Sequence, residues 1–189
     1  MRIIAGRHRG RPLRAPEGKG IRPTSDRARQ AVFNILEHGI PGFAFEGVSV
    51  ADVFCGTGAL GLEALSRGAA HATFIDTDAL ALKYAKENAA RLGEWRNILI
   101  LKLDATRAAP PPLAARGPCA LAFLDPPYGE GLLGPALQGL AARGWLAVGA
   151  VVVAEMGAKE TFEPPKGYAL IQERVYGAAK VAFLRLAGE

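Results

Sequence analysis

The sequence has few cysteines, few histidines and no long apolar run. Its 189 residues include two cysteines and three histidines, with the spacing of neither a disulfide framework nor a metal site. No apolar stretch approaches the ~18 residues that a membrane helix needs, and the first residues lack the hydrophobic segment of a signal peptide. These absences argue against a disulfide-stabilised secreted protein and a membrane protein. We expect a cytoplasmic protein with free thiols and no bound metal.

Charge is plentiful and unevenly distributed. Residues 1–29 carry nine basic side chains against two acidic ones, a net charge of +7, whereas the rest of the chain sums to −2. Eight of the nine are arginines, whose planar guanidinium group suits phosphate recognition. A basic arm on a nearly neutral body is typical of a protein with a polyanionic partner, although a solvated arginine-rich tail would look the same.

The chain length fits one domain with a sizeable core. In residues 1–22, short apolar pieces alternate with glycine and arginine, which predicts a small N-terminal β-hairpin extension. Residues 23–189 form the main domain in this interpretation. Its first helix has apolar residues at helical spacing between Ala28 and Leu36 and ends at Gly39.

The main domain alternates predicted strands and helices. Nearly continuous apolar runs, typical of strands buried on both faces, occur at 48–54, 72–75, 98–103, 119–124 and 146–154. Helix-like segments occur at 59–67, 79–92 and 132–143, and residues 108–118 form a loop. This order predicts an α/β, Rossmann-like fold with a mostly parallel, doubly wound sheet. The strands 168–176 and 179–186 flank a short turn, so we expect the sheet to end in an antiparallel hairpin.

A glycine-rich turn follows the first predicted strand of this sheet. Gly56, Gly58 and Gly61 have G-x-G-x-x-G spacing at a strand-to-helix junction, where backbone amides can approach a nucleotide-like ligand. The motif alone is weak, because a close-packed turn that binds nothing has the same spacing. Asp52, four residues earlier, would repel a pyrophosphate and attract a cation. We therefore expect an adenosine compound with an ammonium or sulfonium group rather than NAD.

Acidic residues also follow the next two predicted strands. Asp76 lies 24 residues after Asp52, where a carboxylate can accept hydrogen bonds from ribose hydroxyls. Asp104, followed by Ala105, is placed to accept a hydrogen bond from an adenine amino group. Each of these aspartates could instead cap a loop or helix, as we expect for Asp78. Ligands of open α/β sheets bind at the carboxyl ends of the strands, so the residues together predict one adenosine site there.

The fourth predicted strand ends in Asp125-Pro126-Pro127-Tyr128. The prolines restrict the backbone, so the Asp125 carboxylate and the Pro126 carbonyl oxygen become fixed acceptors. Tyr128 offers an aromatic face beside them. This combination suits a planar group that carries an amine, although a simple strand-ending turn remains the alternative.

These motifs together resemble a known family. Asp52, Phe54, Gly56, Gly58 and the aspartates at the strand ends are similar to class I S-adenosylmethionine-dependent methyltransferases that modify exocyclic amines. The opening Arg2-Ile3-Ile4-Ala5-Gly6, the segment 22–29 and the Asp-Pro-Pro-Tyr motif resemble the bacterial RsmD family, which methylates N2 of one guanine in 16S ribosomal RNA. The resemblance spans essentially the whole chain.

The resemblance implies a cofactor, a partner and a set of site residues. The cofactor is S-adenosyl-L-methionine, giving S-adenosyl-L-homocysteine, and the partner is 16S rRNA or a small-subunit assembly intermediate, bound by a monomer without membrane contact. The implied cofactor-binding residues are Thr24, Arg27, Asp52, Phe54, Gly56, Gly58, Asp76, Asp104 and Ala105. The implied catalytic residues are Asp125, Pro126, Pro127 and Tyr128. The RNA-binding residues are expected to be Arg7, Arg9, Arg11 and Arg22.

Other interpretations stay open from the sequence. Many amine methyltransferases carry asparagine where this chain has Asp125, which leaves open whether this residue takes a proton or only accepts a hydrogen bond. The acceptor could be adenine N6 or cytosine N4 in DNA, or a glutamine side chain. A non-catalytic RNA-binding assembly factor is a further alternative.

Overall fold

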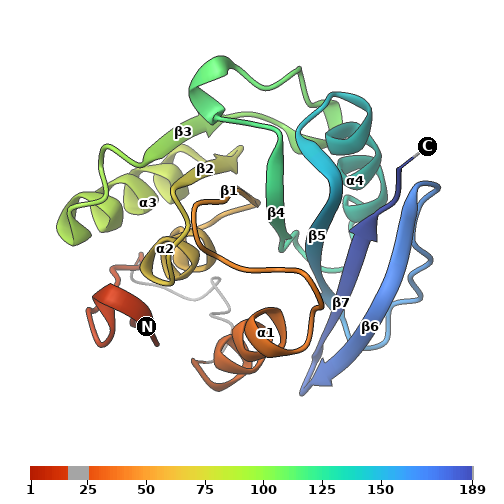
Figure 1. The fold of residues 1–189 in the computed structure, drawn as a ribbon, viewed down its shortest axis with the longest axis horizontal. Coiled ribbons are helices and arrows are strands. Elements are labelled where there is room, and N and C mark those ends of the chain that lie inside the picture. Colours follow the sequence, from red (N-terminus) through yellow and green to blue (C-terminus); the bar gives the residue numbers. More distant parts are fainter. Residues whose placement is uncertain (17–25, 189) are drawn as a thin grey trace.

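The computed structural model describes residues 1–16 and 26–188. Its centre is a seven-stranded sheet in the order β3-β2-β1-β4-β5-β7-β6 (Figure 1). The parallel strands are β1 (Ser49–Val53), β2 (His71–Asp76), β3 (Ile98–Lys102), β4 (Cys119–Leu124) and β5 (Leu146–Gly157). The antiparallel strands β7 (Ala179–Leu186) and β6 (Tyr168–Tyr176) complete one edge. The predicted Rossmann-like sheet with its terminal hairpin is confirmed.

Helices cover both faces of the sheet. The helices α1 (Asp26–His38), α2 (Ala59–Ser66) and α3 (Ala79–Leu92) share one apolar core with the sheet, and α4 (Leu133–Ala142) packs in a second core on the other face. Along β1, Val50 belongs to the first core and Ala51 and Val53 to the second. Strands buried on both faces explain why the sequence runs are apolar throughout rather than alternating.

The helix and strand boundaries follow local signals in most places. Asp78 caps α3 by accepting a hydrogen bond from the Leu80 N–H, and Gly93 ends it with φ 78°. The predicted loop 108–118 contains the short 3-10 turn η3 (Leu113–Ala115). β5 is longer than its apolar run predicts, because its last residues pair with β7 as far as Gly157↔Ala179.

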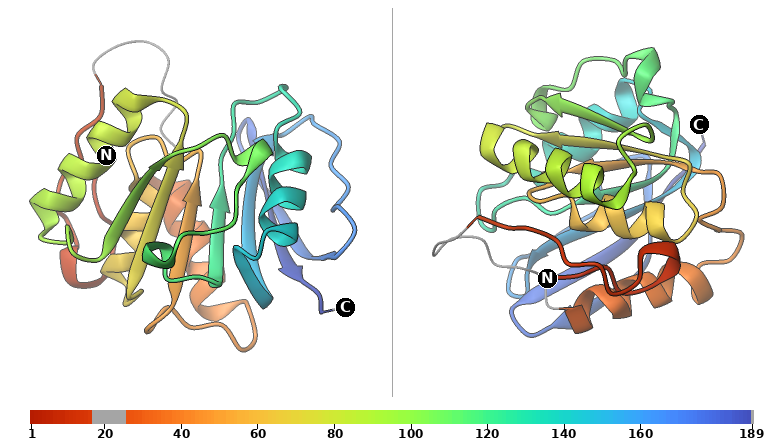
Figure 2. Two further views of the ribbon diagram at one scale, coloured as in Figure 1. Left: turned by 90° about the horizontal axis from the view of Figure 1, so that it is seen from above. Right: turned by 90° about the vertical axis from the view of Figure 1, so that its left-hand side faces the viewer.

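The N-terminal extension is a minimal antiparallel hairpin. Arg2 and Pro12 form a single bridge, the Ile3 N–H donates to the Arg11 carbonyl oxygen over 2.9 Å, and a 3-10 turn, η1 (Gly6–His8), lies in the loop. The buried residues Ile3 and Leu13 belong to the core under α1–α3. The extension therefore packs directly on the main domain (Figure 2), and the predicted boundary at residue 22 lies outside the described residues.

A buried carboxylate on α2 fixes the extension. Glu63 accepts hydrogen bonds from the backbone N–H groups of Ile4, over 2.8 Å, and Ala5, over 3.0 Å. It also forms an ion pair with Arg67, one turn later in the helix. A buried charge is stable only when it is paired and hydrogen-bonded, and Glu63 meets both conditions.

In the part of the chain that the structure describes, none of the helices is long and apolar enough to cross a membrane.

Candidate active site

A cavity of about 670 Å³ opens at the carboxyl ends of the parallel strands. It lies beside the junction of β1 with β2 and β4, where the strand order reverses and open α/β sheets bind their ligands. Its volume falls within the range of small-molecule sites, about 300–1,000 Å³. The lining residues are Phe54, Asp76, Thr77, Asp104, Asp125, Pro126, Pro127, Tyr128, Glu130, Leu132 and Glu155.

The glycine turn combines an open position with a tightly packed one. A Cβ atom added at Gly56, which has φ +52°, would meet no atom within 4 Å. One added at Gly61 would lie 2.5 Å from Phe74 Cε1, so this glycine is needed for α2 to pack closely on β2. The motif thus holds a packing position at Gly61, whereas the Cβ side of Gly56 is clear of the other described atoms.

Asp52 supports this turn from behind. Its side chain is 1% exposed, and its Oδ2 accepts a hydrogen bond from the Gly61 N–H over 2.8 Å. Burial raises the pKa of Asp52 well above its ordinary value; the Gly61 hydrogen bond opposes this rise, and the nearby Asp125 and Asp76 charges add to it. Asp52 does not line the cavity, so its expected direct contact with the cofactor stays a prediction.

Asp76 and Asp104 both line the cavity and both make local hydrogen bonds. Asp76 accepts from the N–H groups of Gly56 and Asp78, each over 3.0 Å, and thereby joins β2 to the glycine turn. Asp104 accepts from the N–H and hydroxyl of Thr106 through the same oxygen, Oδ1. Asp104 is therefore a loop cap whose Oδ2 is still available to a ligand. Ala105, the next residue, is buried and does not line the cavity.

The Asp-Pro-Pro-Tyr motif forms the wall of the cavity beyond β4. The Asp125 N–H donates to the Val53 carbonyl oxygen over 3.3 Å, which ties the motif to β1. Burial raises the pKa of Asp125 to about 7, and the negative charge of Glu155 contributes to the rise. A carboxyl group that titrates near neutral pH suits a proton acceptor at physiological pH.

Glu155, near the end of β5, is a candidate site residue that the sequence motifs did not indicate. The Tyr128 hydroxyl donates a hydrogen bond to Glu155 Oε1 over 2.5 Å, and both residues line the cavity. Glu155 directly follows the apolar run 146–154, and an acidic residue at this strand end was the available signal. Thr77, Glu130 and Leu132 are further lining residues that were not predicted.

A second glutamate fixes the loop after the motif. Glu160 Oε1 accepts hydrogen bonds from the N–H groups of Gly129, over 3.1 Å, and Gly157, over 2.9 Å. This contact links the loop that carries Tyr128 to the end of β5. Tyr128 and Glu155 are therefore held relative to each other by the backbone as well as by their own hydrogen bond.

The expected RNA-binding arginines differ in their surroundings. Arg7 forms an ion pair of 2.7 Å with the nearly buried Glu94, which also contacts His8 over 2.5 Å. Burial alone would raise the pKa of Glu94, but the hydrogen bonds from Asn97, His8 and Arg7 outweigh it and lower the pKa. Arg7 thus has a structural partner.

The other expected arginines lie at the surface of the extension or outside the described residues. Arg11 is exposed and donates to the Arg91 carbonyl oxygen at the end of α3 over 2.7 Å. Arg9 is exposed and lines a separate hollow together with Arg27, so the structure does not bring Arg27 to the central cavity. Arg22 and Thr24 lie outside the described residues.

The residues of the cavity fit a methyl donor of the adenosine class. The ends of β2, β3, β4 and β5 present carboxylates, and among the described residues no basic side chain lines the space, which suits a ligand without phosphate groups. The clear space on the Cβ side of Gly56 leaves room for a ligand to approach the turn. Within the described residues, no group of three or more histidine, cysteine or acidic side chains could hold a metal ion.

Comparisons with known proteins agree with this site. A family model described as conserved hypothetical protein 95 matches residues 1–185. The ribosomal RNA small subunit methyltransferase D of Escherichia coli (strain K12) is 37% identical over 179 residues, which cover 94% of this chain and 85% of that protein. Its namesake from Haemophilus influenzae is 31% identical, over 94% and 89% of the two chains.

Solved structures show the same fold over the full chain. The structure of yhhF from Escherichia coli matches with a TM-score of 0.83 and 33% identity, covering 100% of this chain and 99% of that one. An RNA methyltransferase from Salinibacter ruber, in complex with S-adenosyl-L-homocysteine, shares the fold at 16% identity and a TM-score of 0.59, covering 89% and 95%. The chain belongs to the family of conserved hypothetical protein 95, the RsmD family of class I S-adenosyl-L-methionine-dependent methyltransferases.

Proposed function

We propose that this protein methylates ribosomal RNA of the small subunit, at the exocyclic N2 amine of a specific guanine in 16S rRNA. The observation that carries the proposal is the Asp125–Tyr128 motif on one wall of a cavity whose other wall carries Asp76 and Asp104. The names of the relatives support an rRNA substrate. The choice of guanine N2 rests on the resemblance of the motifs and on the chemistry below.

The cofactor half of the cavity lies at the ends of β1, β2 and β3. Asp76 would accept hydrogen bonds from the ribose hydroxyls, and Asp104 would accept one from the adenine amino group, next to Ala105. The backbone at Gly56 and Gly58 would face the methionyl end, with Asp52 holding the turn. Thr24 is a proposed contact of that end as well, whereas Arg27, which lines a separate hollow, is not assigned to it. When bound, S-adenosyl-L-methionine supplies an electrophilic methyl group on a positively charged sulfur.

The substrate half lies around the end of β4. A guanine flipped out of its RNA context would stack on Tyr128, with its N2 amine donating hydrogen bonds to Asp125 and to the Pro126 carbonyl oxygen. These two acceptors orient the N2 lone pair, which is otherwise delocalised into the ring, toward the methyl group. The bound cofactor would supply the methyl group for the new N–C bond to this lone pair and would keep the electrons of its S–C bond on sulfur. N2 then loses one proton, which Asp125 accepts and passes to water.

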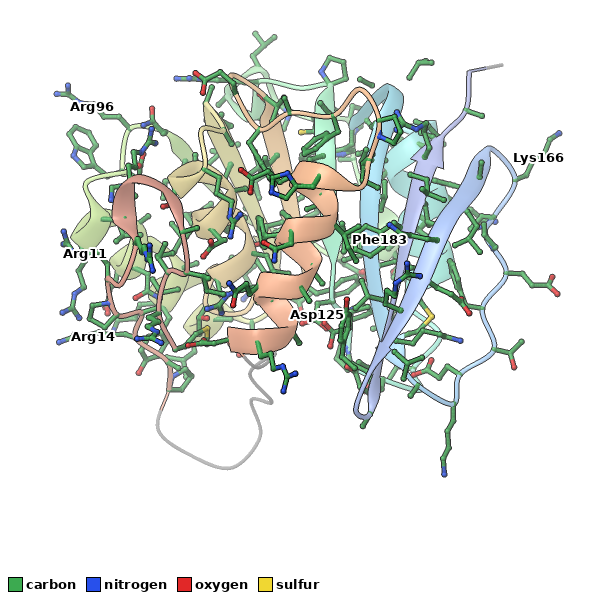
Figure 3. The ribbon with its side chains drawn as sticks, turned by 60° about the horizontal axis from the view of Figure 1, so that its bottom comes forward. Arg11, Arg14, Arg96, Asp125, Lys166 and Phe183 are labelled. Atoms are coloured by element: carbon green, nitrogen blue, oxygen red, sulfur yellow. The ribbon has the colours of Figure 1, made fainter. Side chains whose placement is uncertain are left out.

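The RNA would bind along one edge of the molecule, which we call the basic edge: the side chains of Arg9, Arg11, Arg14, Lys83, Lys86, Arg91, Trp95 and Arg96. Figure 3 shows Arg11, Arg14 and Arg96 along this edge, and the bond from Arg11 to Arg91 joins the extension to α3. Arg7, which pairs with Glu94, and Arg22 are also proposed to contact RNA, because both belong to the basic N-terminal arm of the sequence. A surface with this charge attracts RNA phosphates and makes binding salt-dependent.

Trp95 distinguishes the basic edge from a solvated charged face. Its side chain is 59% exposed, and the Arg96 guanidinium lies 4.5 Å from the centre of its ring. Unpaired RNA bases stack on exposed aromatic rings and on guanidinium planes. We therefore propose that an unpaired nucleotide of the substrate also binds at the basic edge. The protein would bind its substrate as a cytoplasmic monomer.

The decisive experiment compares 16S rRNA from cells that lack the gene with rRNA from complemented cells. The expected result is one N2-methylguanine that is absent without the gene and restored by the wild-type protein. Complementation with Asp125→Ala should not restore it, whereas Asp78→Ala, which removes only a helix cap outside the cavity, should. If the rRNA is the same with and without the gene, and the protein instead methylates naked duplex DNA or a protein glutamine, the proposed substrate is wrong and the protein has that other activity. Failure to bind S-adenosyl-L-methionine in a calorimeter would favour a non-catalytic assembly factor.

A further inference from the structure

A second hollow, of about 310 Å³, lies between the N-terminal extension and the start of α1. It is lined by Arg2, Ile3, Ile4, Arg9, Gly10, Asp26, Arg27 and Gln30. The last turn of α1 leads through a loop into the amino end of β1, so α1 begins toward the end of the sheet where Asp125 lies (Figure 3). The hollow is therefore on the same end of the molecule as the candidate active site, outside its cavity.

The acidic side chain in this hollow already has basic partners. Arg29, which is 1% exposed, donates hydrogen bonds to the Arg2 carbonyl oxygen and, over 3.0 Å, to Asp26 Oδ1. The other oxygen of Asp26, Oδ2, lies 3.4 Å from Arg2 Nε. Burial lowers the pKa of Arg29, and the charges of Asp26 and Glu63 oppose this fall. Asp26 thus acts as the counter-ion of Arg29 and Arg2.

The remaining arginines of the hollow keep an uncompensated charge. Arg9 and Arg27 come from the extension and from α1, and both are exposed. Within residues 1–16 and 26–188, neither forms an ion pair or a side-chain hydrogen bond. Like charges that face one hollow repel each other, and an anion between them turns this repulsion into attraction. The hollow is therefore suited to a compact anion.

We propose that this hollow binds one backbone phosphate of the rRNA substrate, between the guanidinium groups of Arg9 and Arg27. The inference rests on the proposed rRNA methylation and adds a binding site on the α1 side of the extension. Guanidinium groups bind phosphate oxygens through paired N–H donors. Arg9 belongs to both the basic edge and the hollow, so the RNA strand crosses the extension there. Backbone contacts of this kind fix the register of a nucleic acid on its protein.

The test measures methyl transfer to small ribosomal subunits and binding of 16S rRNA, both prepared from cells that lack the gene. Arg9→Gln and Arg27→Gln remove charges that have no partner in the described part of the chain, so both variants should keep the wild-type unfolding temperature. Each should weaken rRNA binding and raise the KM for subunits by roughly tenfold, with kcat unchanged. The matched control is Arg143→Gln, at an exposed position after α4 on the opposite face of the sheet, which should change neither quantity.

The double variant Arg9→Gln/Arg27→Gln tests whether both arginines hold the same phosphate. Loss of one phosphate contact reduces the slope of log K against log salt by about 1. We expect a reduction of about 1 in the double variant as well, and a loss of affinity smaller than the product of the two single losses. A reduction of about 2 with multiplicative losses would show two separate contacts and would overturn the shared site.

Two binding measurements identify other occupants of the hollow. Calorimetry with S-adenosyl-L-methionine should give the same affinity for Arg27→Gln as for the wild-type protein; a weaker affinity would assign the hollow to the cofactor carboxylate and overturn the inference. Calorimetry with inorganic phosphate alone provides the second measurement. If the wild-type protein binds it, Arg27→Gln does not, and rRNA affinity is equal in both, the hollow holds a free anion and the inference is wrong.

The outcomes also separate this inference from the proposed function. A wild-type protein that methylates neither small subunits nor 16S rRNA contradicts the proposed function. A wild-type protein that methylates them, with an Arg27→Gln variant that behaves like Arg143→Gln, overturns the phosphate site alone.

Discussion

The side-chain amide of Asn88, on α3, donates a hydrogen bond to the backbone oxygen of Thr57 in the glycine turn, over 3.1 Å. The same amide donates to the Arg14 carbonyl oxygen over 2.9 Å, and its Oδ1 accepts from the Arg14 N–H over 2.8 Å. Asn88 is 1% exposed. One buried side chain therefore connects the N-terminal extension, α3 and the turn that faces the cofactor space.

Replacing Asn88 with alanine should weaken both the fold and cofactor binding. It removes the partner of three backbone groups, and each buried polar group left unpaired costs about 1–3 kcal/mol. We expect the unfolding free energy to fall by about 2–4 kcal/mol, measured by urea denaturation, together with weaker binding of S-adenosyl-L-methionine in a calorimeter. The control is Asn34→Ala, at an exposed position of α1, which should change stability by less than about 0.5 kcal/mol. Equal effects of the two substitutions would contradict the connecting role of Asn88.

The two ends of the glycine motif should respond differently to alanine. At Gly61 the added Cβ would lie 2.5 Å from Phe74 Cε1 and 3.1 Å from Asp52 Oδ2, so Gly61→Ala should destabilise the fold by about 1–3 kcal/mol. At Gly56 the Cβ meets nothing, and the left-handed φ of +52° costs about 1–2 kcal/mol. We expect Gly56→Ala to weaken cofactor binding more than Gly61→Ala does, relative to its loss of stability. Thermal unfolding and calorimetry on both variants measure the two quantities. Parallel losses in both would show that the motif has one role, not two.

The methyl-transfer rate should depend on pH through Asp125. Burial and the charge of Glu155 raise its pKa to about 7, and the ionised carboxylate is the form that accepts the N2 proton. The rate should therefore rise as the pH increases from 6 to 8, with a midpoint near the pKa of Asp125. In Glu155→Gln the neighbouring charge is absent, so the midpoint should move to lower pH. Single-turnover rates across this range, at saturating cofactor, measure the midpoint.

Asp125→Asn separates the two roles of this residue. The amide oxygen can still accept a hydrogen bond from N2 but cannot take its proton. If hydrogen bonding alone is required, the variant keeps most of its activity and loses the pH dependence near 7. If proton transfer is required, the rate should fall at least 100-fold, within the range of about 10²–10⁴ that general base catalysis contributes. A wild-type rate in the variant with the pH dependence retained would show that another group titrates.

The sequence predicted the parts of the site that depend on local pattern. The apolar runs predicted the positions of the strands along the chain. The polar residues at the strand ends predicted that Asp76, Asp104 and the Asp125–Tyr128 motif lie at one site. Asp52 shows the limit of this reasoning, because the sequence did not indicate that its side chain is buried and accepts a hydrogen bond from the Gly61 N–H on α2; its contact with the cofactor stays a prediction. Glu155 was missed because its position beside the Asp125–Tyr128 motif depends on the register between β4 and β5, which pairs residues about 30 positions apart.

The basic edge provides the last prediction, through Trp95 and Arg96. Truncating Trp95 to alanine removes a stacking surface, and base stacking on an aromatic ring contributes about 1–3 kcal/mol. We expect Trp95→Ala to weaken binding of the rRNA substrate roughly 5- to 100-fold, with an unchanged dependence on salt. Arg96→Ala should weaken binding as well and reduce the slope of log K against log salt by about 1, because one phosphate contact is lost. Filter binding over a range of salt concentrations measures both quantities.

The matched control for this surface is Val148, on β5, whose side chain is 76% exposed. Val148→Ala also removes an exposed apolar group, but from outside the basic edge, so it should leave RNA affinity unchanged. The single-turnover rate at saturating RNA should stay at the wild-type value for Trp95→Ala and Arg96→Ala, since neither residue lines the cavity. If Trp95→Ala binds RNA as tightly as Val148→Ala, no base of the substrate stacks on Trp95, and only the basic side chains of this edge contact the RNA.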